Sequence, residues 1–211
     1  MESALRRSVP PGLTIIETLR WQEGRAVRWD RHATRMASTA RRLHVPAPDF
    51  ETVLDGLPAT GTHRLRLTLD TAGTLERRHG PLGATPRPWR LGLAGQRLDT
   101  TDVWRAMKTS ARAPYDLARA EIPPGLDEVL LLNAAGEIAD GTITNVFALR
   151  SGRLVTPPTA SGCLPGVLRG YLIDRGRAGE ARLTVGDLRG ADAVYVGNSL
   201  RGLIRCALHL P

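Results

Sequence analysis

Apolar residues in the first half of the chain follow the alternating or continuous patterns that are typical of strands. Residues 13–21 are mostly apolar and β-branched, with Glu17 as the charged exception inside the run. Residues 63–70 alternate leucine with arginine and threonine, which predicts a strand with one buried face. Shorter strands are predicted at three further places, which are residues 26–29, the stretch after Gly73, and residues 89–93.

Segments whose apolar residues have the spacing of a helix lie between these predicted strands. Asp30 is the expected N-cap of a helix over residues 31–43, whose apolar positions share one face, namely Met36, Ala40 and Leu43. A second, short helix is predicted over residues 49–57. Residues 94–101 have the composition of a linker, so the first half is predicted to be a small α+β unit with an antiparallel sheet.

The second half is predicted to contain more strand than helix. Helices are expected over residues 114–121 and 167–174, the first with Pro114 in its opening turn. Apolar runs predict strands over residues 127–133, 142–149, 154–156, 183–188 and 193–197, and a last strand through Ile204. The chain is therefore expected to form two domains, an N-terminal α+β domain over residues 1–97 and a C-terminal domain over residues 98–211.

Composition and charge argue against several classes of protein. The chain has 211 residues and a formal net charge of +8, but its arginines are spread along the whole length, without the basic block of a nucleic-acid-binding protein. No run of about 20 apolar residues predicts a membrane span, and no signal-peptide pattern is found. The two cysteines, Cys163 and Cys206, predict neither a disulfide framework nor a metal site, so a cytoplasmic location is expected.

One lysine stands out among the 29 lysine and arginine residues. Every other member of this set is arginine, so the chain uses arginine wherever a positive charge suffices. A guanidinium stays protonated, whereas an ammonium group can lose its proton when it is desolvated and can then attack a carbonyl carbon. Lys108 is therefore the candidate catalytic residue.

Five pieces of the sequence, in a fixed order, carry the candidate chemistry. They are residues 30–36 (DRHATRM), Lys108, residues 136–147 (GEIADGTITNVF), residues 162–169 (GCLPGVLR) and residues 197–199 (GNS). Together they resemble the class IV aminotransferases, which are fold-type IV enzymes that depend on pyridoxal 5′-phosphate (PLP). The resemblance implies a two-domain α+β or α/β fold like that of D-amino-acid aminotransferase, with a shortened N-terminal domain and a PLP-binding domain over residues 98–211.

The resemblance also implies a role for each piece at the cofactor. Lys108 would hold PLP as a Schiff base and move protons, and Asp140 would keep the pyridine nitrogen protonated where the family usually carries glutamate. Arg35 and the helix start at Val167 and Leu168 would bind the phosphate, because helix N-termini bind anions. The expected cofactor-binding set is completed by Thr142, Asn198 and Ser199.

Four other side chains have alternative interpretations. Glu137 is a competing carboxylate, displaced by one residue from the motif and expected to face solvent. Tyr115 is a candidate partner for the cofactor hydroxyl, although its spacing from Lys108 differs from that in the aminotransferases. Cys163 is expected to be a small buried apolar residue, and His32 a structural residue.

Three functions are compatible with these residues. The motifs look most like the aminodeoxychorismate lyase branch of the family, which converts 4-amino-4-deoxychorismate to 4-aminobenzoate and pyruvate in folate precursor synthesis. A class IV aminotransferase for branched-chain or D-amino acids would use the same cofactor residues, and a non-catalytic PLP-binding or arginine-rich interaction protein is the third alternative. The resemblance implies a homodimer that acts on a small-molecule amine, and neither nucleic acid nor a membrane is an expected partner.

Overall fold

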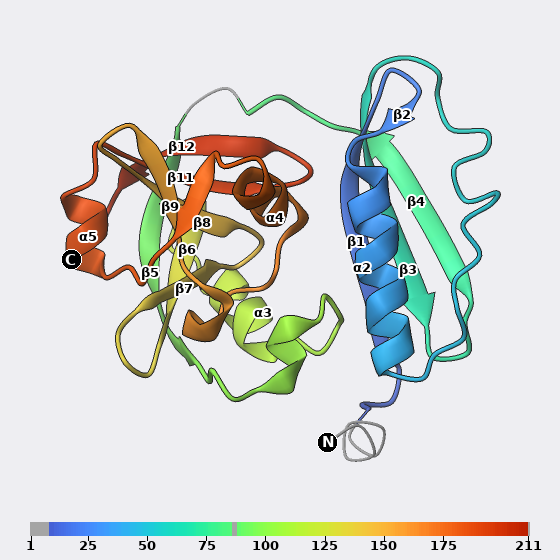
Figure 1. Ribbon diagram of the computed structural model, residues 1–211, viewed down its shortest axis with the longest axis horizontal. Coiled ribbons are helices and arrows are strands. Elements are labelled where there is room, and N and C mark those ends of the chain that lie inside the picture. The colour runs from blue at the N-terminus through green and yellow to red at the C-terminus, as the bar shows by residue number, and fades with distance from the viewer. Residues whose placement is uncertain (1–8, 86–87, 211) are drawn as a thin grey trace. The chain divides into compact units, whose positions relative to one another are not determined.

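A computed structural model describes residues 9–85 and 88–210, which divide into two compact units (Figure 1). The first unit comprises Met1–Ala84 and Met107–Ala111, and the second comprises Thr85–Ala106 and Arg112–Pro211. Each unit has its own β-sheet. None of the helices in the described ranges has both the length and the apolar character that crossing a bilayer requires.

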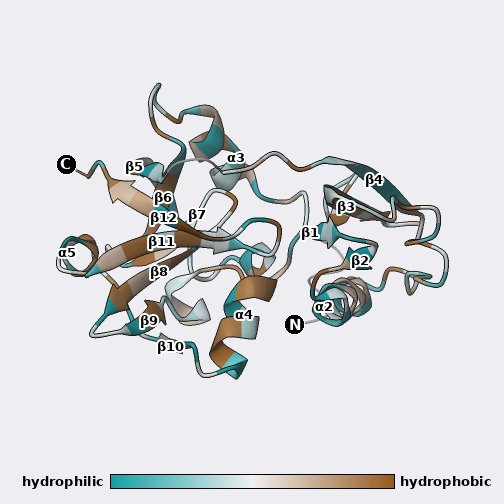
Figure 2. Ribbon diagram, turned by 90° about the horizontal axis from the view of Figure 1, so that it is seen from above, coloured by the Kyte–Doolittle hydropathy of each residue, from teal (hydrophilic) through white to brown (hydrophobic). Residues whose placement is uncertain are grey.

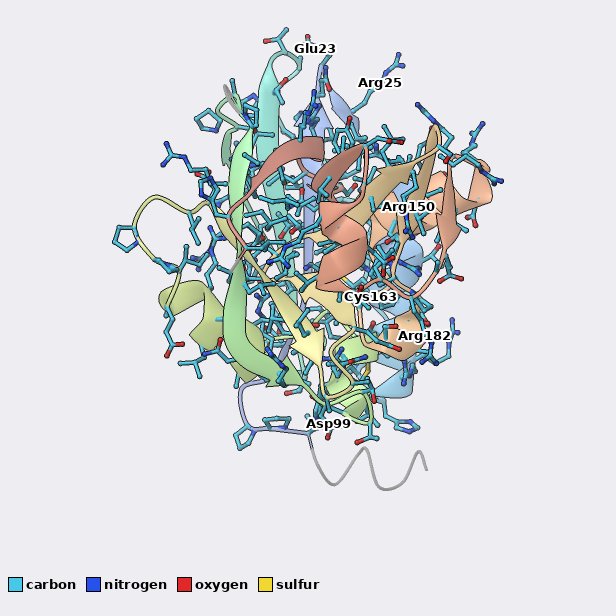
Figure 3. All side chains as sticks on the ribbon, turned by 90° about the vertical axis from the view of Figure 1, so that its left-hand side faces the viewer. Glu23, Arg25, Asp99, Arg150, Cys163 and Arg182 are labelled. Atoms are coloured by element: carbon cyan, nitrogen blue, oxygen red, sulfur yellow. The ribbon has the colours of Figure 1, made fainter. Side chains whose placement is uncertain are left out.

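The first unit is an antiparallel sheet of strand order β2-β1-β3-β4 with one helix packed against β1 (Figure 1). Its elements are β1 (Thr14–Gln22), β2 (Arg25–Ala26), α2 (Trp29–Arg42), β3 (Thr62–Asp70) and β4 (Leu75–Pro81). Leu65 and Leu67 of β3 are fully buried, as is Met36 of α2, so the predicted apolar faces form the core of this unit. Glu23, labelled in Figure 3 at the β1–β2 turn, has φ 48° and precedes Gly24, whose φ is 72°.

The segment that carries Lys108 is part of the first unit because it pairs with the edge of β1. The N–H of Ile16 donates to the carbonyl oxygen of Lys108 at 2.8 Å. The N–H of Ser110 donates to the carbonyl oxygen of Thr14 at 2.9 Å, and the Thr14 N–H donates to Ser110 Oγ at 3.0 Å. The backbone of Lys108 is therefore held at the edge of β1 by an isolated antiparallel bridge between Ile15 and Thr109.

The second unit is built on an eight-stranded sheet of order β10-β9-β8-β11-β12-β5-β6-β7. The strands are β5 (Trp89–Leu98), β6 (Glu128–Asn133), β7 (Ile138–Gly141), β8 (Asn145–Arg150), β9 (Arg153–Thr156), β10 (Ala178–Glu180), β11 (Ala193–Asn198) and β12 (Gly202–Leu208). The helices are α3 (Ala113–Ala120), α4 (Val167–Asp174) and α5 (Val185–Arg189), with short 3₁₀ turns at Val103–Ala106 and Thr159–Ser161.

Apolar side chains cover both faces of the middle of this sheet. All six residues of β6 are buried. Leu130 of β6 belongs to a core cluster with Val146 and Val196, whereas Leu131 belongs to a cluster on the other face with Ala118 of α3. Figure 2 shows the same contrast by colour, since β8 and β11 are largely hydrophobic and β4 of the first unit is hydrophilic. The second unit thus supplies a rigid frame for the loops that follow its strands.

The division between the units differs from the predicted boundary after residue 97. Residues 94–101 were expected to form a linker, but β5 continues to Leu98 and pairs in parallel with β12 and β6. A register shift between Leu93 and Arg97 interrupts the ladder, so the alternation of side chains that marks a strand is broken there. The whole of β5 therefore belongs to the second unit.

Three predicted elements are also wrong. No helix forms over residues 49–57, which turn instead at Gly56 with φ 67°. Residues 183–188 do not form a strand, because Thr184 and Asp187 make a capping box that begins α5. The strand predicted over 26–29 ends at Ala26, and Arg28, with φ 60°, takes the N-cap position expected of Asp30.

Candidate active site

Lys108 lies in the first unit with its backbone fixed and its side chain half-buried. Its neighbours Met107 and Thr109 are both buried, with 3% of their surface exposed. The strand-like pairing with β1 sends alternate side chains in opposite directions, so Lys108 points away from the two neighbours that anchor the segment. The amine is thus carried on a well-anchored backbone.

A buried charge cluster in the same unit surrounds Arg35. The Arg35 guanidinium donates from Nε to Glu17 Oε1 and from Nη2 to Glu17 Oε2, both at 2.7 Å. His32 Nδ1 lies 2.6 Å from Glu17 Oε2. Glu17 and His32 are each only 1% exposed, and the Arg35 side chain is 15% exposed. Arg35 is therefore a bidentate partner of a carboxylate within its own unit.

The protonation states of this cluster follow from its burial and its charges. Burial opposes ionisation of Glu17, but the Arg35 charge and the hydrogen bonds from His32 and Arg35 outweigh it and lower the pKa of Glu17 to about 2. Burial also lowers the pKa of His32, although Glu17 opposes this effect. An ionised Glu17 can only accept hydrogen bonds, so a neutral His32 must carry its proton on Nδ1.

Acidification is expected to destabilise the protein through Glu17. Because its folded pKa is lowered from 4.5 to about 2, its stabilising contribution is complete above about pH 4.5 and is lost as the pH falls towards 2. Burial of neutral His32 acts in the same direction below about pH 6.5, its ordinary pKa. Urea unfolding should show a free energy that falls between pH 7 and pH 3 by about 2 kcal/mol more in the wild type than in Glu17→Gln. Equal slopes would contradict this assignment.

Asp140, in the second unit, is a buried carboxylate whose two oxygens are both oriented. Oδ1 accepts a hydrogen bond from Asn145 Nδ2 and Oδ2 accepts one from the Leu164 N–H, each at 2.9 Å. Asn145 Nδ2 also donates to the Leu164 carbonyl oxygen at 2.9 Å. A Cβ atom at Gly166 would lie 1.9 Å from Asn145 Oδ1, so only glycine fits there. Asp140 is thereby joined to the loop that leads into α4.

Thr142 is held by a second buried carboxylate, that of Glu128. The N–H and hydroxyl of Thr142 both donate to Glu128 Oε1, and the Thr144 hydroxyl donates to Oε2 at 3.0 Å. Glu128 is fully buried at the start of β6. Its carboxylate therefore fixes the turn between β7 and β8 that follows Asp140, and the hydroxyl of Thr142, a residue predicted to bind cofactor, is one of the groups that it holds.

Two of the predicted phosphate-binding pieces lie side by side. Val167 and Leu168 open α4, and within the described part of the chain no side chain caps this helix. A Cβ at Gly197 would lie 2.9 Å from Leu168 Cδ2, so the end of β11 lies close against the start of the helix. Asn198 donates from Nδ2 to the Ile143 carbonyl oxygen at 3.2 Å, and Ser199 is buried. The part of β11 that leads into Asn198 and Ser199 thus packs against Leu168 in the first turn of α4.

The three remaining candidates of the second unit have different surroundings. The hydroxyl of Tyr115 is buried without a hydrogen-bond partner among the described residues, and burial, with the Asp140 charge, raises its pKa. Burial and Asp140 raise the pKa of Cys163 to about 12, so its thiol is protonated and unreactive, as expected. Glu137 accepts hydrogen bonds from three side chains, which are Ser161, Asn133 and Arg182, the last labelled in Figure 3. Its side chain is only 14% exposed, so the expectation that Glu137 faces solvent is wrong.

Glu17 and Glu128 are the residues of these clusters that the sequence reasoning did not identify. Glu17 is in phase with Ile15, Leu19 and Trp21 on the buried side of β1, and a carboxylate at such a position signals a buried partner. Glu128 gives the same signal at the start of an apolar strand. Within residues 9–85 and 88–210, no three His, Cys, Asp or Glu side chains gather as metal ligands would.

Comparison with known proteins identifies the family. The model of the class IV aminotransferases matches residues 14–208. The aminodeoxychorismate lyase of Vibrio harveyi is 27% identical over 93% of this chain and 83% of its own length. A protein of Thermotoga maritima assigned as a branched-chain-amino-acid aminotransferase is 32% identical over 47% of this chain and 38% of its own length.

A solved structure extends the match to the fold. The crystal structure of a Mesorhizobium loti protein assigned as an amino-acid aminotransferase is 43% identical, with a TM-score of 0.86 over 93% of this chain and 99% of that chain. Such agreement in sequence and backbone covers both units described above. The chain therefore belongs to the class IV aminotransferase family, whose members are PLP-dependent enzymes, and it has the fold-type IV architecture.

Proposed function

We propose that this chain is a PLP-dependent lyase that converts 4-amino-4-deoxychorismate to 4-aminobenzoate and pyruvate. The observation that carries the cofactor assignment is the buried Asp140 carboxylate, oriented by Asn145 and Leu164. The lyase reaction is supported by the similarity to the Vibrio harveyi lyase along most of both chains. We also propose that the enzyme is a homodimer, which light scattering after gel filtration would test.

The residues of the second unit fit the cofactor. Tyr115 has a buried hydroxyl that lacks a hydrogen-bond partner among the described residues, and such groups are rare unless water or a ligand satisfies them. Burial and, after it, the Asp140 charge raise the pKa of the Tyr115 hydroxyl, so this hydroxyl stays protonated and can donate a hydrogen bond. The start of α4 offers N–H groups and a favourable dipole to a phosphate.

Each residue has a separate task in the proposed reaction. PLP supplies an aldehyde and an aromatic ring that accepts electrons from the reacting carbon. The Lys108 amine would bind the aldehyde until the amine of the substrate displaces it, and the freed Lys108 amine would then take the proton from the amine-bearing carbon of the substrate. The Asp140 carboxylate would hold a proton on the pyridine nitrogen, because a nearby negative charge favours the cationic form. Arg35 and the N–H groups of Val167 and Leu168 would hold the phosphate.

The geometry of Arg35 refines this last role. Its Nε and Nη2 atoms already face Glu17, so the edge that usually makes bidentate contacts is taken by a carboxylate. Glu17 therefore fixes the position and plane of the guanidinium that would meet the phosphate. Thr142, Asn198 and Ser199 stay predicted as neighbours of the cofactor on the basis of the motifs.

An aminotransferase is the second candidate function. It is favoured by the similarity to the Mesorhizobium loti and Thermotoga maritima proteins, both assigned as aminotransferases. The same residues would serve both reactions, since each begins with removal of a proton from the amine-bearing carbon. The lyase splits one substrate into 4-aminobenzoate and pyruvate, whereas an aminotransferase needs a second, oxo-acid substrate.

A pyruvate assay separates the two reactions. Purified protein with PLP is expected to release one pyruvate for each 4-aminobenzoate formed from aminodeoxychorismate, without any added oxo acid. The matched reaction with a branched-chain or D-amino acid should give no product under the same conditions. Turnover that starts only after 2-oxoglutarate or pyruvate is added would instead establish the aminotransferase.

A further inference from the structure

The Arg35 guanidinium is fixed through a chain of two hydrogen-bonding contacts that begins at His32. His32 faces Glu17 Oε2 from Nδ1 at 2.6 Å, and Glu17 in turn accepts two hydrogen bonds from Arg35, each at 2.7 Å. Glu17 lies on β1, whereas His32 and Arg35 lie one turn apart on α2. The three groups are thus carried on two regular elements that pack together.

Such an arrangement removes the freedom that an arginine side chain otherwise keeps. Arginine has many rotamers, and holding it in one of them costs conformational entropy. A carboxylate that binds Nε and Nη2 together fixes both the position and the plane of the guanidinium. The Nδ1–H of His32 in turn donates to Glu17 Oε2 and so restricts the orientation of this carboxylate.

We propose that His32, acting through Glu17, is a positioning residue that fixes the Arg35 guanidinium for the phosphate of the cofactor. This inference rests on the proposed function, in which Arg35 binds that phosphate. It departs from the sequence expectation for His32, which assigned it a structural role alone.

Glu17 itself is a poor choice for the test because its charge has two opposite effects. Its carboxylate orients Arg35, but its negative charge also repels a phosphate. Removing the charge would change both effects together. His32 is neutral in the folded protein, since burial lowers its pKa, so a substitution there alters the orientation without changing the charge of the cluster.

The chain allows a matched pair of substitutions at this position. In His32→Asn the side-chain amide nitrogen takes the place of Nδ1 and can still donate to Glu17, whereas His32→Leu has a similar size and no donor. His79→Leu, at an exposed position of β4, is the control for replacing a histidine elsewhere in the same unit. Calorimetric titration of each full-length protein with PLP and with pyridoxal, which lacks the phosphate, gives two dissociation constants and their ratio.

We expect the ratio of the dissociation constants for pyridoxal and PLP to change, and not only the affinity for PLP. His32→Leu should lower the preference for PLP over pyridoxal by about tenfold, because the hydrogen bond that it removes is made to a charged carboxylate; tenfold corresponds to about 1.4 kcal/mol. His32→Asn should keep the preference within about twofold of the wild type. His79→Leu should leave both constants unchanged. If His32→Leu does not fold by circular dichroism, His32→Met, which also has no donor for Glu17, replaces it with the same expectation.

Other results would overturn the inference in distinguishable ways. Equal weakening of PLP and pyridoxal by His32→Leu would mean that His32 only supports the fold. An unchanged ratio in His32→Leu, with a ratio that collapses in Arg35→Met, would reject the positioning role while Arg35 keeps its phosphate role. A wild type that binds PLP no better than pyridoxal, or binds neither, would reject the proposed function itself.

Discussion

A Lys108→Ala variant is expected to lose about four orders of magnitude or more in kcat, because no other side chain in the chain can supply a nucleophilic amine. The fold should survive, since the pairing of this segment with β1 uses the backbone oxygen of Lys108 and not its side chain. Pyruvate release measures the loss, and circular dichroism with thermal unfolding checks that the variant is folded.

Lys108→Arg is the matched control because it keeps the positive charge and removes the attacking amine. It should be as inactive as the alanine variant. Borohydride treatment of the wild type with PLP should fix the cofactor to the peptide that contains Lys108, and mass spectrometry can identify this peptide without ambiguity since there is one lysine. An arginine variant with more than about a tenth of wild-type kcat would show that charge alone is needed.

Asp140→Asn is expected to lower kcat by about 100-fold or more while PLP stays bound. The amide has the same shape but no charge, so it cannot favour a protonated pyridine nitrogen. One of its ends would also present N–H groups to either Asn145 or Leu164, both of which donate to Asp140 in the folded protein. The measurements are kcat at saturating PLP and the amount of cofactor retained after gel filtration.

Glu137→Gln is the control for Asp140, because Glu137 is the other carboxylate within the same motif. Glu137 accepts hydrogen bonds from Ser161, Asn133 and Arg182, and these hydrogen bonds lower its pKa. Its carboxylate therefore has a structural role that needs no cofactor. Its replacement should change kcat less than about twofold. A full-strength Asp140→Asn enzyme together with an impaired Glu137→Gln enzyme would exchange the two assignments.

Elements with strong local signals could be predicted from the sequence. The helix expected over residues 167–174 agrees with α4, Val167–Asp174, because Pro165 and Gly166 precede a short apolar run. The strand predicted over residues 63–70 agrees with β3, Thr62–Asp70, because the alternation of its leucines is also a signal contained within a few neighbouring residues. The Thr184 capping box was also available from the sequence, but its apolar flanks favoured a strand.

Features that depend on distant partners could not be predicted. The strand character of residues 94–98 comes from pairing with β6, across the register shift near Arg97. Residue type and the order of the motifs were enough to name the candidate residues. Their partners Glu17 and Glu128 were not named, because only the folded chain brings each of these carboxylates to its hydrogen-bond donors. Helices and strands can be predicted because apolar residues recur at a fixed spacing, whereas side-chain networks of this kind follow no such spacing along the sequence.

The edge pairing of β1 has a consequence for biosynthesis. Thr14 and Ser110 are 96 positions apart, and the first unit remains without this pairing until the later segment has emerged from the ribosome. In the meantime the nascent chain displays an open strand edge, which is the kind of surface that associates with other chains or with chaperones. The arrival of the lysine segment thus completes the unit during translation, so the residue expected to carry the chemistry is delivered by the same event that closes the exposed edge.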